Sequence, residues 1–254
     1  MPQSTAPAPT RSIRARTTVA VERDAVLRTL RCEPPLTVRR VHGPRGECAL
    51  CLVGTAAGPL PGDDLALLLD IGPDAQASLS AAGASLALGP IGGTALGPAR
   101  IATAATIAPG GALRAQPPPL ILAAGSWVEA SVSIRLAAGA SVQWQEMVVL
   151  GRSGEPGGRL RLRWDVSCDG LPLLRQVIDL ADRALAGWPV MLQRGAVLAS
   201  ALVVGPQVAA RTIVASQRAV AARLADDAVL VTVLDDNAHD AQSAVNDLLM
   251  RVRS

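Results

Sequence analysis

Apolar and polar residues alternate along most of the chain with a period of two, which is typical of β-strands. Three stretches repeat one pattern: an alternating strand, a short turn rich in Gly and Ala, and a second alternating strand. These units begin at Leu65, Ala99 and Trp127, and their turns contain Gly72, Gly110 and Gly139. One such unit cannot bury its apolar face alone, so we expect the units to stack on one another and share a core.

The same alternation extends from Thr17 to about Asp179 and is interrupted by Gly, Pro and Asp. Near its end, every second residue from Arg159 to Arg163 is an arginine, so Arg159, Arg161 and Arg163 lie on one face of a predicted strand. The Asp169-Gly170 pair that follows accepts positive φ and predicts a hairpin. The sequence therefore predicts a mainly β fold, a scaffold of stacked strands and hairpins.

The C-terminal part combines strand and helix patterns. Residues 197–205 and 228–234 are predicted strands, and a short helix is expected near Ala215–Leu224. Asn237 is a predicted N-cap for a helix that ends near Arg253 and carries apolar residues at helical spacing. We expect this helix to pack on the sheet, so that a strand and a helix close the fold over about 183–254.

Residues 1–16 are rich in Pro, Ser, Thr and Arg and are expected to form a disordered tail. Residues 17–254 are expected to form one β-rich domain, because a chain of 254 residues is long enough to bury a sizeable core.

The composition excludes several classes of function. The chain has no Phe, no Tyr and four Trp, so it lacks the stacking platforms of a single-strand binder, and its net charge of +3 is too small to indicate nucleic acid. No apolar stretch is long enough for a membrane span or a signal peptide. Four cysteines do not suggest a disulfide framework, so we expect a cytoplasmic protein with reduced thiols.

Candidate catalytic chemistry is sparse. Histidine occurs only twice, and the chain has neither a nucleophile elbow nor a phosphate-binding loop with Lys. Asp63 and Asp64 could form an acid–base pair or bind a cation, but adjacent residues on an extended chain diverge, and turn formation is the alternative. Cys48 and Cys51 lie three apart on a predicted strand, and hence on opposite faces, which favours core cysteines over a chelating pair.

The order of several segments resembles the urease accessory proteins called UreD or UreH. In the first half the matching positions are Pro35, Leu36, Val38, Arg40, Cys48, the turn from Gly58 to Gly62-Asp63, and Gly72 to Ala75. In the second half they are Leu113 to Pro119 and the segment from Gln145 to Glu155, which contains Glu146, Gly151, Arg152, Gly154 and Glu155. The similarity covers roughly residues 30 to 180, and the segment that ends at Glu155 is its most specific part.

The resemblance implies a non-enzymatic, mainly β chaperone that binds apo-urease and acts with the partners UreF and UreG. It implies that nickel passes to the urease active site as transient cargo, through an internal channel, without a tightly bound cofactor. Under this hypothesis Gly58, Gly62, Asp63, Gly72, Gly110 and Gly139 are structural turn residues. Glu146, Gly151, Arg152, Gly154 and Glu155, with the three arginines, are family-motif residues and candidate partner contacts.

Two other hypotheses remain open at this point. One is a small-molecule hydrolase that uses the Asp63/Asp64 corner. The other is a general β-scaffold interaction protein, in which the repeated units serve only to build surface.

Overall fold

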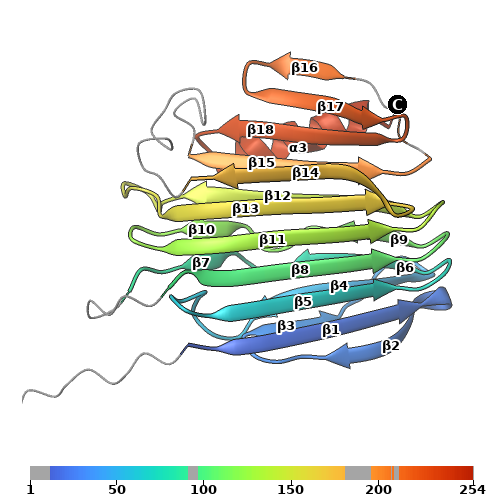
Figure 1. Cartoon of the computed structure of the whole chain (residues 1–254), viewed down its shortest axis with the longest axis horizontal. Coiled ribbons are helices and arrows are strands. Elements are labelled where there is room, and N and C mark those ends of the chain that lie inside the picture. Colours follow the sequence, from blue (N-terminus) through green and yellow to red (C-terminus); the bar gives the residue numbers. More distant parts are fainter. Residues whose placement is uncertain (1–11, 91–96, 181–195, 207, 209–211, 254) are drawn as a thin grey trace, which may run out of the picture.

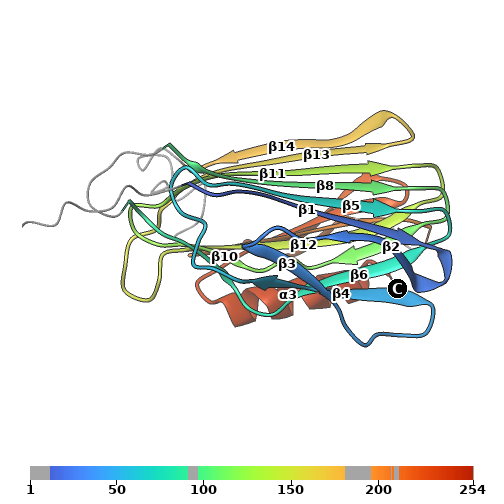
Figure 2. The same cartoon turned by 90° about the horizontal axis from the view of Figure 1, so that it is seen from below.

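Two stacked β-sheets make up most of the molecule (Figure 1; Figure 2). The computed structural model describes residues 12–90, 97–180, 196–206, 208 and 212–253. In these residues the seven-stranded sheet contains β1 (Arg14–Glu22), β2 (Val26–Arg31), β5 (Asp64–Ile71), β8 (Ala99–Ile107), β11 (Trp127–Leu136), β13 (Arg159–Cys168) and β14 (Leu171–Asp179).

The eleven-stranded sheet contains the remaining strands: β3 (Leu36–Arg40), β4 (Glu47–Gly54), β6 (Gln76–Ala81), β7 (Ser85–Ala87), β9 (Ala112–Ala115), β10 (Leu120–Leu122), β12 (Ser141–Leu150), β15 (Val197–Val204), β16 (Ile213–Ser216), β17 (Ala219–Ala225) and β18 (Ala228–Asp235). A 3-10 turn, η1 (Arg23–Ala25), follows β1, and the helix α3 (Ala238–Arg251) follows β18. The mainly β fold with a C-terminal strand and helix is confirmed.

The three repeated units form the centre of this arrangement. Each unit places its first strand in the seven-stranded sheet and its second strand in the eleven-stranded sheet, as β5–β6, β8–β9 and β11–β12. Strands β5, β8 and β11 pair in parallel, as do β6, β9 and β12. The units therefore stack as expected, but the two strands of one unit pair with neighbouring units and not with each other.

The turn of each unit is a β-turn that crosses between the sheets. Its closing hydrogen bonds are Ala75 N–H to Gly72 O at 3.2 Å, Gly111 N–H to Ala108 O at 2.9 Å, and Ala140 N–H to Ala137 O at 3.1 Å. The third residue of each turn has positive φ, and these residues are Asp74 (52°), Gly110 (68°) and Gly139 (73°). Gly72 thus opens its turn, while Asp74, a residue type that tolerates this conformation, takes the left-handed position.

Antiparallel strands finish both sheets. The hairpin predicted at Asp169-Gly170 joins β13 to β14, and both turn residues have positive φ. In the eleven-stranded sheet, β15, β18, β17 and β16 continue outward from β12 in antiparallel order.

The core lies between the sheets, where inward-facing Val, Leu, Ile and Ala residues of both layers meet Trp144 and Trp164, which are both fully buried. A second apolar cluster lies between α3 and the outer face of β15, β17 and β18. The predicted helix is confirmed: the side-chain oxygen of Asn237 accepts a hydrogen bond from His239 N at 2.7 Å, and Ala241, Val245, Leu248 and Leu249 are buried.

Two predictions from the sequence differ from the structure. β1 begins at Arg14, so residues 14–16 of the expected tail are strand, because they pair in parallel with β5; residues 1–11 lie outside the described part. The helix expected near Ala215–Leu224 is wrong, since β16 and β17 form an antiparallel pair there. The small apolar residues that suggested a helix alternate in burial, and Ala219 and Ala221 are buried in the cluster that includes α3.

We expect Gly139→Val to lower the free energy of unfolding by about 1–2 kcal/mol, because a residue with a Cβ is disfavoured at positive φ. Space is not the limiting factor, since a Cβ at Gly139 would meet nothing within 4 Å. Chemical denaturation followed by circular dichroism measures the effect. The matched control is Gly54→Val, where a Cβ also meets nothing and φ is not positive; equal losses in both variants would contradict the turn assignment.

Candidate functional site

The turn that contains Gly58, Gly62 and Asp63 is held together by the Asp63 carboxylate. Asp63 is buried; its Oδ1 accepts a hydrogen bond from Ile13 N at 2.8 Å and its Oδ2 accepts one from Leu60 N at 2.9 Å. Gly58 and Gly62 both have positive φ, which a turn glycine accepts without strain. Asp63 therefore anchors the entry to β5 and ties this turn to the start of β1.

The two carboxylates of the Asp63/Asp64 corner do not come together. Asp64 is the first residue of β5, lies on the outer face of the seven-stranded sheet, and has the Arg14 guanidinium 3.9 Å away. Asp63 points into the turn, where backbone N–H groups occupy both of its oxygens. This geometry does not provide the shared acid–base site that the hydrolase hypothesis requires.

Glu146 lies between the two sheets, not on the surface where a partner contact was expected. It belongs to β12, on the same face as Trp144, and the Nε1 of Trp164 on β13 donates a hydrogen bond to its carboxylate at 2.6 Å. Burial raises the pKa of Glu146 to about 7, and the hydrogen bond from Trp164 offsets only part of this rise. Glu146 is thus a half-buried carboxyl group whose pKa is raised to about 7.

A cavity of about 100 Å³ between the sheets is lined by Glu146. Its other lining residues are mostly apolar and include Leu36, Leu65, Pro117 and Trp144. The Nε1 of Trp144 is buried and lacks a hydrogen-bond partner among the described residues. The cavity is therefore mainly apolar, with the Glu146 carboxylate and the hydroxyl residues Ser85 and Thr103 in its lining.

The wall of this cavity has a gap in its strand pairing. β12 pairs with β9 over residues 141–144 and with β10 over residues 148–150. Between these ladders, residues 145–147 lie opposite residues 116–119, where Pro117, Pro118 and Pro119 have no N–H to donate. Glu146 and Pro117 line both the cavity and a small pocket beneath α3, so these residues form the wall that the two hollows share.

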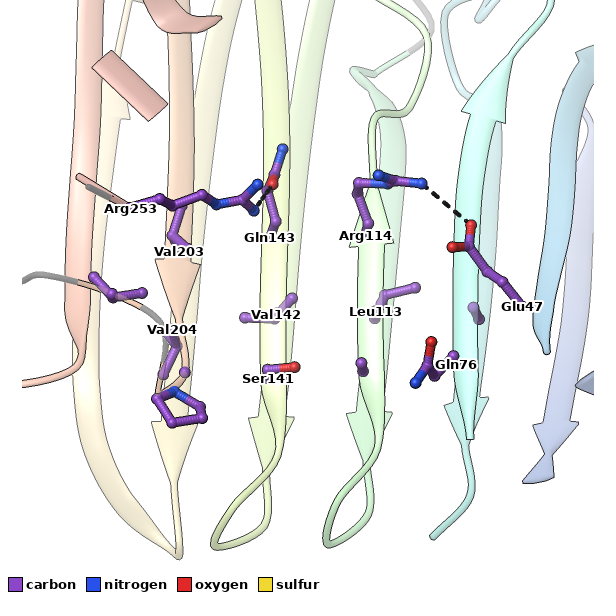
Figure 3. A pocket seen from close by; sticks show the side chains of 15 residues that line it. Glu47, Gln76, Leu113, Arg114, Ser141, Val142, Gln143, Val203, Val204 and Arg253 are labelled. Carbon is purple, nitrogen blue, oxygen red and sulfur yellow. Dashed lines mark hydrogen bonds and ion pairs between the residues drawn. The ribbon is translucent and has the colours of Figure 1, made fainter. Parts of the chain in front are cut away.

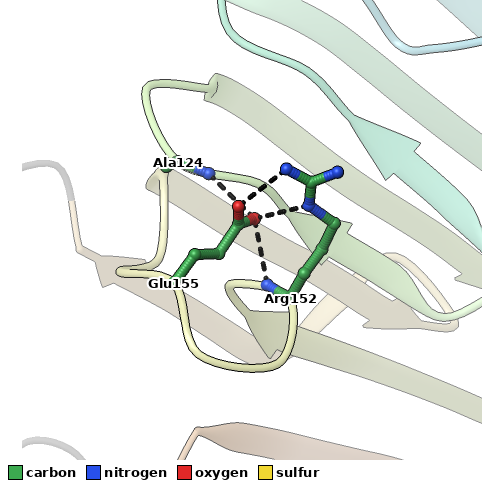
Figure 4. Close-up of polar contacts among 3 residues, drawn as sticks. All are labelled: Ala124, Arg152 and Glu155. Atoms are coloured by element: carbon green, nitrogen blue, oxygen red, sulfur yellow. Dashed lines mark hydrogen bonds and ion pairs between the residues drawn. The ribbon is translucent and has the colours of Figure 1, made fainter.

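The segment from Gly151 to Glu155 forms a closed loop after β12 (Figure 4). The Glu155 carboxylate accepts hydrogen bonds from Arg152 Nε at 2.9 Å, Arg152 N at 3.1 Å and Ala124 N at 3.2 Å, and the second guanidinium N–H group of Arg152 donates to it at 2.8 Å. The Arg152 side chain, followed by these backbone donors, lowers the pKa of Glu155 to about 2.

Glycine is required at the start of this loop. Gly151 has positive φ, and a Cβ there would lie 2.4 Å from the Glu155 carbonyl oxygen. Gly154 also has positive φ. The motif from Gly151 to Glu155 thus has a structural explanation as a loop clamp, and its contact with a partner stays a prediction.

The three arginines of β13 lie on the outer face of the seven-stranded sheet, as predicted. Arg159 stacks over the Trp127 ring with its guanidinium carbon 4.4 Å from the centroid. Arg161 lies 3.7 Å from the Asp179 carboxylate, and Arg163 pairs with Asp165. Cys48 and Cys51 lie on opposite faces of β4 as predicted, but only Cys48 is a core cysteine, because Cys51 is half-buried.

A groove of about 320 Å³ opens on the outer face of the eleven-stranded sheet, beside the end of α3 (Figure 3). Its polar side chains are mostly paired: Arg114 lies 3.2 Å from the Glu47 carboxylate, and Arg253 donates to the side chain of Gln143. The groove is a polar surface between the helix and the uncovered strands β4, β6 and β9.

The sequence analysis did not identify the pairing of Glu146 with Trp164 across the sheets. A signal was available, because Glu146 occupies an inward position of an alternating strand whose other inward residues are Val142, Trp144 and Val148.

Among the described residues, no three His, Cys, Asp or Glu side chains are grouped so as to hold a metal ion, and no helix is long and apolar enough to span a bilayer.

Comparison with known proteins identifies the family. A family model described as "UreD urease accessory protein" matches residues 11–254. The chain belongs to the UreD family. It is similar to Urease accessory protein UreD 1 of Streptomyces griseus subsp. griseus, with 38% identity over 193 residues that cover 74% of this chain and 74% of that protein. It is also similar to the UreD protein of Parafrankia sp. (strain EAN1pec), with 33% identity over 260 residues that cover 91% of this chain and 86% of that protein.

Membership of the UreD family confirms the resemblance seen in the sequence. It also agrees with the prediction that the chain is not an enzyme, because the family and these relatives are accessory proteins by name. The hydrolase hypothesis is therefore overturned by the family and by the separation of Asp63 from Asp64.

Asp63→Asn is expected to lower the free energy of unfolding by about 1–3 kcal/mol, because an amide offers one acceptor oxygen where the carboxylate serves two backbone N–H groups. Thermal and urea denaturation measure the loss. Asp64→Asn, at an exposed position, serves as the control and should change stability by less than about 0.5 kcal/mol. A neutral Asp63→Asn variant would contradict the anchoring role.

Glu146→Gln should change how stability depends on pH. The folded-state pKa of Glu146 is raised to about 7 from an ordinary value of 4.5, so between these values the folded chain keeps a proton that the unfolded chain has released. The wild type should therefore lose up to about 3 kcal/mol of stability as pH rises from about 4.5 to about 7. The variant, which can still accept from Trp164, should lack this loss. Parallel pH profiles of the two proteins in urea denaturation would disprove the assignment.

Proposed function

We propose that this chain is an accessory protein in the maturation of urease, and that it helps nickel reach the active site of apo-urease in the cytoplasm together with UreF and UreG. The match of the UreD family model across residues 11–254 carries this proposal. Two relatives that are named as urease accessory proteins also support it, because this chain is similar to them over most of their length. In this role the chain is a scaffold, and nickel is its transient cargo.

Glu146 is the residue of this chain that we propose to contact nickel during transfer. Its side chain lines a cavity between the sheets and also a second pocket beneath α3. Because its pKa is about 7, the group can exchange a proton for a metal ion near neutral pH. A single oxygen ligand holds a divalent transition metal weakly, and weak binding permits release to a stronger site.

The loop closed by Arg152 and Glu155 is our proposed contact for a protein partner. Its backbone is fixed by hydrogen bonds from two segments, so its outer surface is preorganised for binding. The Arg152 side chain retains 59% of its surface exposure, which leaves its outer edge accessible.

The test is urease activation in cells that carry the cognate urease genes and receive nickel, with and without this gene. We expect urease protein in both strains, but nickel bound to urease and urease activity only where this chain is present. Full activity in the strain that lacks the gene would refute the proposal.

A second comparison in the same cells tests the proposed nickel contact. Glu146→Gln should lower the nickel content of urease by roughly tenfold, the scale expected for an altered metal contact. The control is Glu22→Gln at an exposed position at the end of β1. Wild-type nickel content with Glu146→Gln would exclude Glu146 from the transfer path and leave the maturation role intact.

A further inference from the structure

A row of six charged side chains crosses the outer face of the seven-stranded sheet, with one residue on each of six neighbouring strands. Strand register places them side by side in the order Arg14, Asp64, Arg100, Glu129, Arg161, Asp179, from β1 to β14. The signs alternate along the whole row. This face is turned toward the viewer in Figure 1, and we refer to the six residues as the charge row.

Within the chain the charge row forms three loose ion pairs. The separations are 3.9 Å for Arg14 and Asp64, 3.3 Å for Arg100 and Glu129, and 3.7 Å for Arg161 and Asp179. The side chains remain between 36% and 90% exposed. Ion pairs this exposed contribute only about 0–1 kcal/mol each, so fold stability is a weak explanation for six alternating charges.

The surface beside the charge row consists mainly of small side chains on the central strands. The next residues along these strands are Ala66, Ala102 and Ser131, followed by Leu68, Ala104 and Ser133. Next to them, a hollow of about 320 Å³ is bordered by residues of β5, β8, β11 and β13. Small side chains allow another flat surface to approach closely, at the spacing of about 10 Å at which sheets pack face to face.

We propose that this face binds a second copy of the same chain, related by a two-fold axis that runs parallel to the strands between β8 and β11. This axis places the two charge rows opposite each other in reverse order. Because the six charges alternate in sign, each positive residue of one copy then faces a negative residue of the other. Arg14 then faces Asp179 of the second copy, Asp64 faces Arg161, and Arg100 faces Glu129. The hollow, which spans two strands on each side of this axis, lies at the centre of the interface.

The neighbouring rows are compatible with this arrangement. No like charges meet across the axis in these rows. Arg16 faces Val177, Arg163 faces Ala66, Asp165 faces Leu68, Arg175 faces Thr18, Arg135 faces Thr106, and Asp70 faces Ser167. Six strands and about eight residues of each strand give roughly 600 Å² per copy, or about 1,200 Å² in total, which reaches the lower end of stable interfaces. Charge complementarity and area thus both fit a second copy of the chain.

Swapping the charges of one ion pair tests this interface. Variant A carries Arg14→Asp with Asp64→Arg, and variant B carries Arg161→Asp with Asp179→Arg. Each swap keeps the ion pair within the chain but places like charges opposite each other in a symmetric dimer. Sedimentation velocity of the full-length chain should show a dimer for the wild type, weakened by rising salt, and a dissociation constant at least about 100-fold higher for A alone and for B alone.

The mixture of variants A and B is the decisive measurement. When A faces B, all six positions are again opposite in charge, so the mixture should form a heterodimer with wild-type affinity. The matched control, Arg100→Glu with Glu129→Arg, creates similar like-charge neighbours within the chain but keeps the interface complementary, so it should dimerise normally. A wild type that stays monomeric at tens of micromolar would overturn the proposal. A dimer that survives both swaps, or variants that fail to associate when mixed, would overturn it equally.

Discussion

The constraint on which this structure depends is that each repeated turn carries the chain from one sheet to the other. The strands on either side of such a turn do not pair with each other, so the ladder hydrogen bonds of β5, β8 and β11 come from neighbouring units or from the flanking strands β1 and β13. Parallel stacking is therefore obligatory in the centre of the molecule. Antiparallel strands appear only at the margins, where β2, β14 and β3 end the stack and the strands from β15 to β16 extend it.

This architecture also determines where polar groups can be buried. A stacked pair of sheets has one continuous interior, and the chain fills it with aliphatic residues and two tryptophans instead of Phe or Tyr. Glu146 is an ionisable residue in this interior, and its desolvation is offset in part by the Trp164 N–H that reaches it from the opposite sheet. The inward position of Glu146 on β12 raises the pKa of its carboxylate and also places the side chain at the cavity. The raised pKa and the proposed nickel contact therefore both result from this position.

The sequence predicted the elements of this fold better than their pairing. Alternation located the strands, Asn237 located the start of the helix, and Asp169-Gly170 located a hairpin. Alternation is identical, however, whether a turn folds a strand back beside its partner or sends it to another sheet, so the crossing turns could not be inferred. The buried carboxylates could not be identified either, since Asp63 and Glu146 acquire their surroundings from Ile13 and Trp164, which lie 50 and 18 residues away in the chain. Resemblance to a family identified Glu146 as important but assigned it to the surface.

The proline segment opposite residues 145–147 affects how the two hollows are separated from each other. Strands that are joined by ladder hydrogen bonds separate only by local unfolding, on a timescale of microseconds to seconds. At this gap the described segments share no ladder pairs, and the side chains of Glu146 and Pro117 border the hollows on both sides. At this position the two hollows are separated by side chains and not by a hydrogen-bonded ladder, so the separation between them depends on side-chain packing.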